Sequence, residues 1–160
     1  MSPVPNPVVR DPVIVTVSPR KAAVVRIEVP AARLGEAIGL AIGEVTSAIA
    51  ANSLFPIGGP FTHYLSWAAD MVVAEVGFPV TGDVIPRGRV VAGELPGGTL
   101  ATIFHLGTYD TLGESYGRLE AWIRGRGNEP ADTMWEVYLR GPGAEANPAQ
   151  WRTEIYWPFR

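Results

Sequence analysis

Two stretches of this chain match each other, and this internal duplication limits the folds open to the chain more than any other feature. Residues 61–65 align with residues 135–139, and GFPV at 77–80 aligns with YWPF at 156–159. The spacing of about 75 residues is that of a large structural unit used twice, and not that of a solenoid array. We therefore expect two similar halves related by a pseudo-two-fold axis.

The first half, about residues 13–80, is predicted to contain four strands and one helix. The strands are expected near 13–17, 22–29, 61–65 and 70–80. Between the second and third strands, apolar residues recur at spacings of three and four, which is typical of one face of a helix. Pro30 suits the start of this helix, and Asn52 suits its end. The apolar face consists of Leu34, Ile38, Ile42, Val45 and Ile49.

The second half, about residues 87–160, repeats this order. Its strands are expected near 89–95, 100–106, 133–139 and 154–159. The PGG between the first two strands is a strong signal for a hairpin turn. Thr111 and Glu114 have the spacing of a capping box, which predicts the start of a second helix that ends near Gly125. Its apolar face consists of Leu112, Tyr116, Leu119 and Ile123.

These patterns predict a single α+β domain over residues 13–160, built from a tandem, pseudo-symmetric βαββ duplication. We expect an antiparallel sheet that carries two long helices, with a central ligand cleft between the halves, on the pseudo-two-fold axis. Residues 1–12 contain four prolines and are expected to form an extended N-terminal lead-in.

The composition argues against several classes of function. A formal net charge of −3 and a single lysine, Lys21, argue against a general nucleic-acid binder. A chain without cysteine has no disulfide, no thiolate nucleophile and no cysteine metal site. Glu36 and Glu44 interrupt the longest apolar stretch, and the N-terminus lacks the pattern of a signal peptide. We therefore expect a cytoplasmic protein that does not span a membrane.

No metal site or cofactor is predicted. Neither of the two histidines, His63 and His105, has a partner at metal-ligand spacing. The glycine clusters lack the GK[ST] of a P-loop, and no G-x-S-x-G sequence frames a nucleophilic serine.

Glu136 lies at the centre of TMWEVYL, a predicted strand in which most residues are apolar or aromatic. The first half has Thr62 at the same position, so the repeat itself does not require an acid there. Strand alternation puts Met134, Glu136 and Tyr138 on one face. If this face lines the cleft, the acid is a candidate functional group. If it faces solvent, Trp135 and its alternate neighbours form the core face.

A carboxylate buried without a basic partner has two chemical uses. Burial raises its pKa, and an incoming cation supplies the missing counter-charge, with aromatic faces adding roughly 0.5–2 kcal/mol per good contact. A carboxyl with a raised pKa can also act as a general acid or base at neutral pH. The sequence alone leaves both uses open.

Four short motifs, in this order and spacing, resemble the GyrI-like small-molecule-binding domains, also called bacterial effector-binding domains. They are Gly107-x-Tyr109 before the second helix, AWIRGRG at its end, MWEVYL, and the final EIYWPF. The resemblance covers roughly residues 13–160 and is to stand-alone members, because the chain shows no helix-turn-helix segment. It implies that Glu136 lies in an aromatic-lined pocket that binds lipophilic, often cationic, aromatic molecules.

The resemblance and the repeat together give a set of candidate ligand-binding residues. They are Glu136, Tyr138, Met134, Tyr64, Thr62, Tyr109 and Trp67. The expected function is multidrug binding, with a role in drug sequestration or resistance. The alternative is hydrolysis of cyclopropane-containing or similar electrophilic toxins, with Glu136 as general acid or base and Tyr138 as its partner. A weaker alternative is modulation of DNA gyrase through a protein contact.

Overall fold

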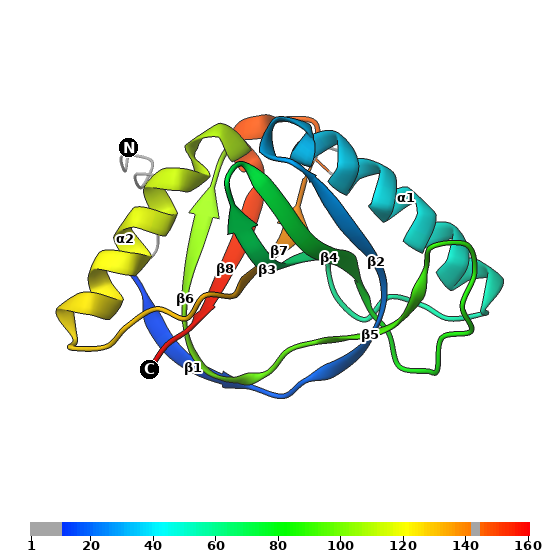
Figure 1. Cartoon of the computed structure of the whole chain (residues 1–160), viewed down its shortest axis with the longest axis horizontal. Helices are drawn as coiled ribbons and strands as arrows, with labels where there is room; N and C mark the ends of the chain where they lie inside the picture. The colour runs from blue at the N-terminus through cyan, green and yellow to red at the C-terminus, as the bar shows by residue number, and fades with distance from the viewer. Residues whose placement is uncertain (1–10, 142–144) are drawn as a thin grey trace, which may run out of the picture.

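A computed structural model describes residues 11–141 and 145–160, so the expected lead-in lies almost entirely outside the described residues. The described chain forms eight strands and two long helices (Figure 1). The strands are β1 (Val13–Val17), β2 (Arg20–Pro30), β3 (Phe61–Ala68), β4 (Met71–Pro79), β5 (Val91–Leu95), β6 (Gly98–Leu106), β7 (Met134–Arg140) and β8 (Arg152–Pro158). The helices are α1 (Leu34–Ala51) and α2 (Leu112–Gly125).

All eight strands belong to one curled antiparallel sheet in the order β1-β6-β8-β7-β3-β4-β2-β5. The two helices pack on it at separate places, α1 on β2 and β4, and α2 on β6 (Figure 1). The central pair, β3 and β7, lies between these two places. The predicted α+β architecture, an antiparallel sheet with two long helices, is confirmed.

The duplication predicted from the sequence is present in the fold. β1 and β5 begin at Val13 and Val91, which are 78 positions apart, and α1 and α2 begin at Leu34 and Leu112, which are also 78 apart. Both short strands have the same pattern of exposed and half-buried residues. The two halves therefore use the same elements at the same spacing.

Thr62 and Glu136 mark the position of the pseudo-two-fold axis. They are equivalent positions of the two halves, 74 residues apart, and they are also direct partners in the ladder between β3 and β7. Residues that are both equivalent and opposite each other must lie on the axis that relates the halves. The position at which Glu136 takes the place of a neutral residue is thus at the centre of the fold.

A continuous ladder joins the two ends of the sheet. β1 pairs with β6, and β5 pairs with β2. Val17 lies opposite Gly98 and Arg20 lies opposite Leu95, so the register is the same on both sides of the short linkers. The segment β1–β2 therefore runs antiparallel to β5–β6, as the two bent ribbons along the bottom of Figure 1 show.

The hairpin predicted from PGG is wrong, because β5 and β6 do not pair with each other. Gly97 lies instead where the two linkers run side by side in close contact. A Cβ atom at this position would be only 2.5 Å from the carbonyl oxygen of Val17 and 2.5 Å from the nitrogen of Pro19. The glycine is needed for the close approach of two chain segments, and not for a tight reversal.

Three clusters of buried apolar side chains fill the fold. The first lies between α1 and the sheet and includes Val45 and Val76. The second lies between α2 and the sheet and includes Leu119 and Ile155. The third lies inside the curl, where Phe61 packs against β2 of the closing ladder. The sheet is therefore covered on both faces, by helices outside and by its own closing strands inside.

The helical segment Ala31–Ala51, which contains α1, is long and apolar enough by length and composition to cross a membrane, with a mean hydropathy of 1.4. Glu36 and Glu44 thus interrupt the apolar stretch less than the sequence analysis assumed. In this fold α1 lies on the sheet, with Ala41 and Val45 buried against it. On its outer side Glu44 forms an ion pair with Arg89.

α2 begins where predicted, but without the expected capping hydrogen bond. Thr111, the residue before the helix, has φ −101° and ψ 4°, so it is not extended, because its backbone continues the preceding 3-10 turn. Its hydroxyl therefore donates back to the Thr108 carbonyl oxygen at 3.0 Å. Buried His105 completes this arrangement, with Nδ1 2.7 Å from Oγ of Ser115, and so fixes the start of α2 on β6.

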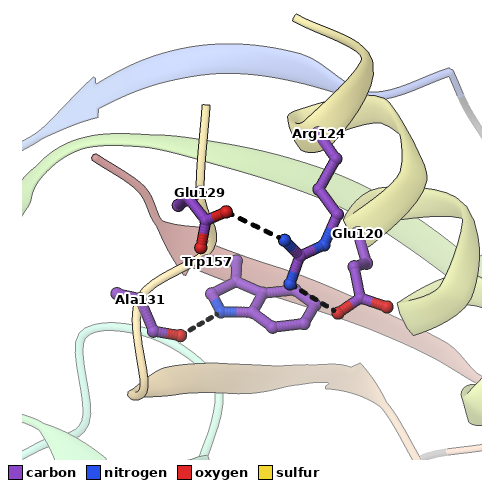
Figure 2. A network of polar contacts seen from close by, with 5 residues as sticks. All are labelled: Glu120, Arg124, Glu129, Ala131 and Trp157. Atoms are coloured by element: carbon purple, nitrogen blue, oxygen red, sulfur yellow. Dashed lines mark hydrogen bonds and ion pairs between the residues drawn. The ribbon is translucent and has the colours of Figure 1, made fainter. Parts of the chain in front are cut away.

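The segment that leads from α2 into β7 is held by a polar network (Figure 2). The Arg124 guanidinium forms ion pairs with Glu129 at 3.2 Å and with Glu120 at 3.5 Å. Beside it, the Trp157 indole donates to the carbonyl oxygen of Ala131 at 2.8 Å. These contacts fix the residues immediately before β7 to α2 and β8.

Candidate functional site

A cleft of about 1060 Å³ lies over β3 and β7, between the two helices. Its floor consists of side chains from these strands, and its walls are the first turns of α1 and α2. The walls contain equivalent residues of the two halves, Leu34 and Ile38 in α1 and Leu112 and Tyr116 in α2. The cleft thus lies on the pseudo-two-fold axis, as the duplication predicts.

Glu136 points into this cleft and is only 3% exposed. Met134 and Tyr138, on the same face of β7, line the cleft as well. Trp135 lies on the opposite face, where it stacks on Tyr156 with the ring centroids 5.9 Å apart. The alternative that Glu136 faces solvent is therefore wrong. The apolar face of the strand faces the inside of the curl, and not the helices.

Tyrosine hydroxyls surround the Glu136 carboxyl. Tyr64 donates a hydrogen bond to its Oε2 at 3.0 Å. The Tyr138 hydroxyl lies 3.4 Å from the same oxygen and 2.8 Å from Oγ1 of Thr62, so Thr62 is its nearer acceptor. Tyr116 also lines the cleft, and its hydroxyl oxygen is buried; within the described part of the chain no contact of this hydroxyl has full hydrogen-bond geometry.

Burial raises the pKa of Glu136 from its usual 4.5 to about 7. Desolvation is the main cause of this increase. The hydroxyls of Tyr64, Tyr116 and Tyr138 lower the pKa, but by less than desolvation raises it. Among the described residues, no arginine, lysine or histidine lines the cleft or forms an ion pair with Glu136. The carboxyl is therefore about half ionised at neutral pH, without a counter-charge from this part of the chain.

The tyrosines around the acid remain protonated at neutral pH. Burial, followed by the charge of Glu136, raises the pKa of Tyr64, Tyr116 and Tyr138 well above the usual value. The same two causes raise the pKa of half-buried Tyr109. Each phenol can therefore donate to an anion through its hydroxyl or present the face of its ring to a cation.

Aromatic rings continue on both sides of Glu136. On one side Tyr64 packs against Trp67, with centroids 5.7 Å apart. On the other side Tyr138 packs against Tyr109 at 5.8 Å, and Tyr109 packs against a further indole, that of Trp151, at 5.2 Å. A ligand with aryl groups on both sides of a central charge can therefore contact rings at either end of the cleft.

The structure brings six of the seven candidate residues into the lining of the cleft. They are Glu136, Tyr138, Met134, Tyr64, Tyr109 and Trp67. Thr62 is not part of the lining, since it is fully buried and its hydroxyl accepts the hydrogen bond from Tyr138. Thr62 therefore orients the Tyr138 side chain from beneath the floor of the cleft. This position does not support the predicted contact between Thr62 and a ligand.

The sequence analysis missed Tyr116, Gly35 and Gly113, which also line the cleft. A signal for them was present, because both helices begin with the same motif, LGEAIG at 34–39 and LGESYG at 112–117. A Cβ atom at Gly35 or Gly113 would meet no atom within 4 Å. The repeated glycine thus widens the cleft at the same place in both walls.

Comparison with known proteins agrees with this geometry. The family model of the GyrI-like small molecule binding domain matches residues 10–160. No curated protein matches the sequence of the chain.

Several solved structures share the fold. The EcmrR C-terminal domain is 23% identical, with a TM-score of 0.78 over 94% of this chain and 97% of that one. The EcmrR chain in the cryo-EM structure of the EcmrR–DNA complex is 21% identical, with a TM-score of 0.80 over 96% of this chain. This chain spans only 58% of the length of that one.

Two further structures have lower identity. SAV2435 bound to tetraphenylphosphonium is 9% identical, with a TM-score of 0.64 over 94% of each chain. A hydrolase encoded by lin2189 from Listeria innocua is 12% identical, with a TM-score of 0.63 over 94% of this chain and 92% of that one. At such identities the likeness shows the fold alone. Because the family match covers essentially the whole chain and the fold agrees with it, the chain belongs to the GyrI-like family of small-molecule-binding domains.

Proposed function

We propose that the cleft binds lipophilic aromatic cations, with Glu136 as their counter-charge. The observation that carries this proposal is a carboxyl that is 3% exposed, has a pKa raised to about 7, and has no basic partner among the described residues. Ionising such a group is costly as long as no positive charge is near it. A cation that enters the cleft removes this cost. It should therefore bind more tightly than a neutral molecule of the same shape.

The walls of the cleft add affinity without demanding one exact ligand. Apolar surface that a ligand removes from water contributes about 25 cal/mol per Å². Rings such as those of Tyr64, Trp67 and Tyr109 add cation–π attraction of roughly 0.5–2 kcal/mol per good contact. Because area and charge supply most of this free energy, selectivity is broad. Sequestration of toxic cations in the cytoplasm, as a form of drug resistance, is the cellular role we propose.

The experiment is a calorimetric titration of tetraphenylphosphonium into the wild type and Glu136→Gln, with Glu28→Gln as control. Glu28 is an exposed acid on β2, so its variant changes the net charge by the same amount away from the cleft. We expect micromolar affinity for the wild type and the control, and an affinity at least about tenfold weaker for Glu136→Gln, a difference of about 1.4 kcal/mol. Equal affinity in all three proteins would remove Glu136 from cation binding.

Hydrolysis of electrophilic toxins is a second candidate, favoured by one observation. A carboxyl with a pKa of about 7, with the Tyr64 hydroxyl at 3.0 Å, suits general acid–base chemistry at neutral pH. The test is turnover of a cyclopropane-bearing alkylating agent by the wild type. Turnover that disappears in Glu136→Gln while binding persists would favour the hydrolase, whereas cation binding without turnover would favour the binding protein.

A further inference from the structure

Asp132 is the second acid in the lining of the cleft, and it is exposed. Tyr64 of β3 pairs with Met134, the first residue of β7, and both strands run antiparallel. The ladder between β3 and β7 ends at this pair, so Asp132, before Met134, and Trp67, after Tyr64, lie beyond the same end of the ladder, and both line the cleft. Asp132 and the indole of Trp67, which is 56% exposed, thus occupy the same end of the cleft.

The backbone holds Asp132 at this end. Its neighbour Ala131 donates from its N–H to the Pro158 carbonyl oxygen at 2.8 Å. The Ala131 carbonyl accepts from the Trp157 indole at 2.8 Å, beside the ion pairs of Arg124 (Figure 2). Both peptide groups of the preceding residue are fixed to β8, so Asp132 is presented by a rigid segment.

The charge of Asp132 is also unmatched within the described part of the chain. It forms no ion pair there, and the described lining of the cleft contains no basic side chain. The cleft therefore carries one buried acid at its centre and one exposed acid at the Trp67 end. The two acids are four positions apart in the sequence, which corresponds to roughly 13 Å along an extended chain.

We infer that Asp132 and Trp67 form a second cationic subsite, so that the cleft prefers elongated dications over monocations. One positive charge lies at Glu136, and the other lies between the Asp132 carboxylate and the face of the Trp67 indole. This inference rests on the proposed cation binding at Glu136. Two linked charges gain most when the spacer matches the distance between subsites, which gives the inference a length dependence.

The experiment compares two series at low ionic strength, where exposed charges are least screened. The first series is bis-trimethylammonium alkanes with increasing spacers, and the second is alkyltrimethylammonium ions of the same chain lengths. Affinities are measured for the wild type, Asp132→Asn and Asp110→Asn. Asp110 is an exposed acid beside Tyr109 at the opposite end and does not line the cleft, so its variant controls for long-range charge.

We expect the dication whose charges are roughly 13 Å apart to bind about three- to tenfold more tightly than its monocation, after correction for its two equivalent ends. Asp132→Asn should abolish this preference, because the dication then gains no second counter-charge, while Asp110→Asn should keep it. Monocation binding that needs Glu136, with no preference for any dication, would overturn the second subsite alone. Absence of binding by both series would overturn the inference together with the proposed function.

Discussion

The Tyr138 hydroxyl donates to Oγ1 of Thr62 at 2.8 Å, and this hydrogen bond is the pseudo-symmetric counterpart of the one from Tyr64 to Glu136 at 3.0 Å. Each half supplies a tyrosine whose hydroxyl donates across the axis to the other half. The two acceptors, Thr62 and Glu136, are at equivalent positions. Only the second half carries an acid there. Because directly opposed residues of a ladder have Cβ atoms about 5 Å apart, a second carboxylate would repel the first. The axis thus accommodates one charge.

The free energy of unfolding should fall as the pH rises, because of Glu136. The unfolded carboxyl loses its proton near the usual 4.5 and the folded one near 7. Between these values the folded state binds more protons, so stability decreases with increasing pH. The decrease that this shift gives is about 3 kcal/mol between pH 4.5 and 7. Urea denaturation over this range measures it.

Glu136→Gln is the matched variant for this pH dependence. Its amide has the same shape and has no proton to lose, so its stability relative to the wild type should improve by about 3 kcal/mol from pH 4.5 to pH 8. Glu28→Gln, at an exposed position of β2, should follow the wild type. A constant difference between Glu136→Gln and the wild type over this range would contradict the raised pKa.

Cation binding should release a proton at acidic pH. A bound cation favours the ionised carboxylate, so below the pKa of about 7 the ligand must displace the proton of Glu136. Affinity for tetraphenylphosphonium is then expected to fall about tenfold per pH unit below 7 and to be constant above it. Calorimetry at pH 5.5 and 8, in two buffers of different ionisation enthalpy, counts the protons. An affinity independent of pH in the wild type would be inconsistent with this mechanism.

Tyr64→Phe and Tyr138→Phe should affect the acid unequally. Among the three tyrosine hydroxyls that lower the pKa of Glu136, that of Tyr64 has the largest effect. Its removal should raise that pKa further, whereas Tyr138→Phe mainly leaves the Thr62 hydroxyl without its donor. A carbon-13 NMR titration of the Glu136 side chain measures its pKa in each of the two variants. Equal shifts in the two variants would mean that Thr62 is not the principal partner of Tyr138.

The helices and most strands could be predicted because their signals are local. The spacing of apolar residues marks α1 and α2, and the repeat supports each assignment with a second copy. The closing ladder could not be predicted, because it pairs β1 with β6 and β2 with β5 over long sequence separations. The PGG sequence is compatible with a hairpin turn and with a close contact between two antiparallel linkers, and only the non-local pairing partner distinguishes the two.

The candidate site was predictable in identity but not in orientation. Glu136 stands out because the repeat has Thr62 in its place. Its face of β7 could not be assigned from alternation, because both faces of the strand are covered. Trp135 is buried on one face, and the helices flank the cleft on the other. Tyr116 was assigned to the apolar face of α2, where its ring packs against Trp157, and the same residue also lines the cleft. One side chain here serves both the core and the site.

Gly97→Ala should destabilise the protein at the close contact between the two linkers. The added methyl group would lie 2.5 Å from backbone atoms of Val17 and Pro19, which cannot move aside as a flexible side chain can. We expect a loss of about 2 kcal/mol or more in the free energy of unfolding. Gly125→Ala is the control, because a Cβ atom at the end of α2 meets no atom within 4 Å. Equal stability of the two variants would show that the linkers can separate without cost.

Gly39→Leu should block bulky ligands without weakening the fold. Gly39 lines the cleft, and a Cβ atom there meets no atom within 4 Å, so a larger side chain extends into the space of the ligand. Gly43, one turn further along α1, has the same freedom but does not line the cleft. Leucine favours a helix over glycine by roughly 0.5–1 kcal/mol, so both Gly39→Leu and Gly43→Leu should be slightly more stable than the wild type.

Only Gly39→Leu should lose affinity for tetraphenylphosphonium, by at least about tenfold, or 1.4 kcal/mol. The smaller benzyltrimethylammonium should bind both variants as it binds the wild type, because the charge of Glu136 remains accessible to it. Calorimetric titration of each cation into the three proteins tests this, with thermal unfolding as the check on the fold. If Gly43→Leu weakened tetraphenylphosphonium binding as strongly, the first turns of α1 would not be the wall that limits ligand size.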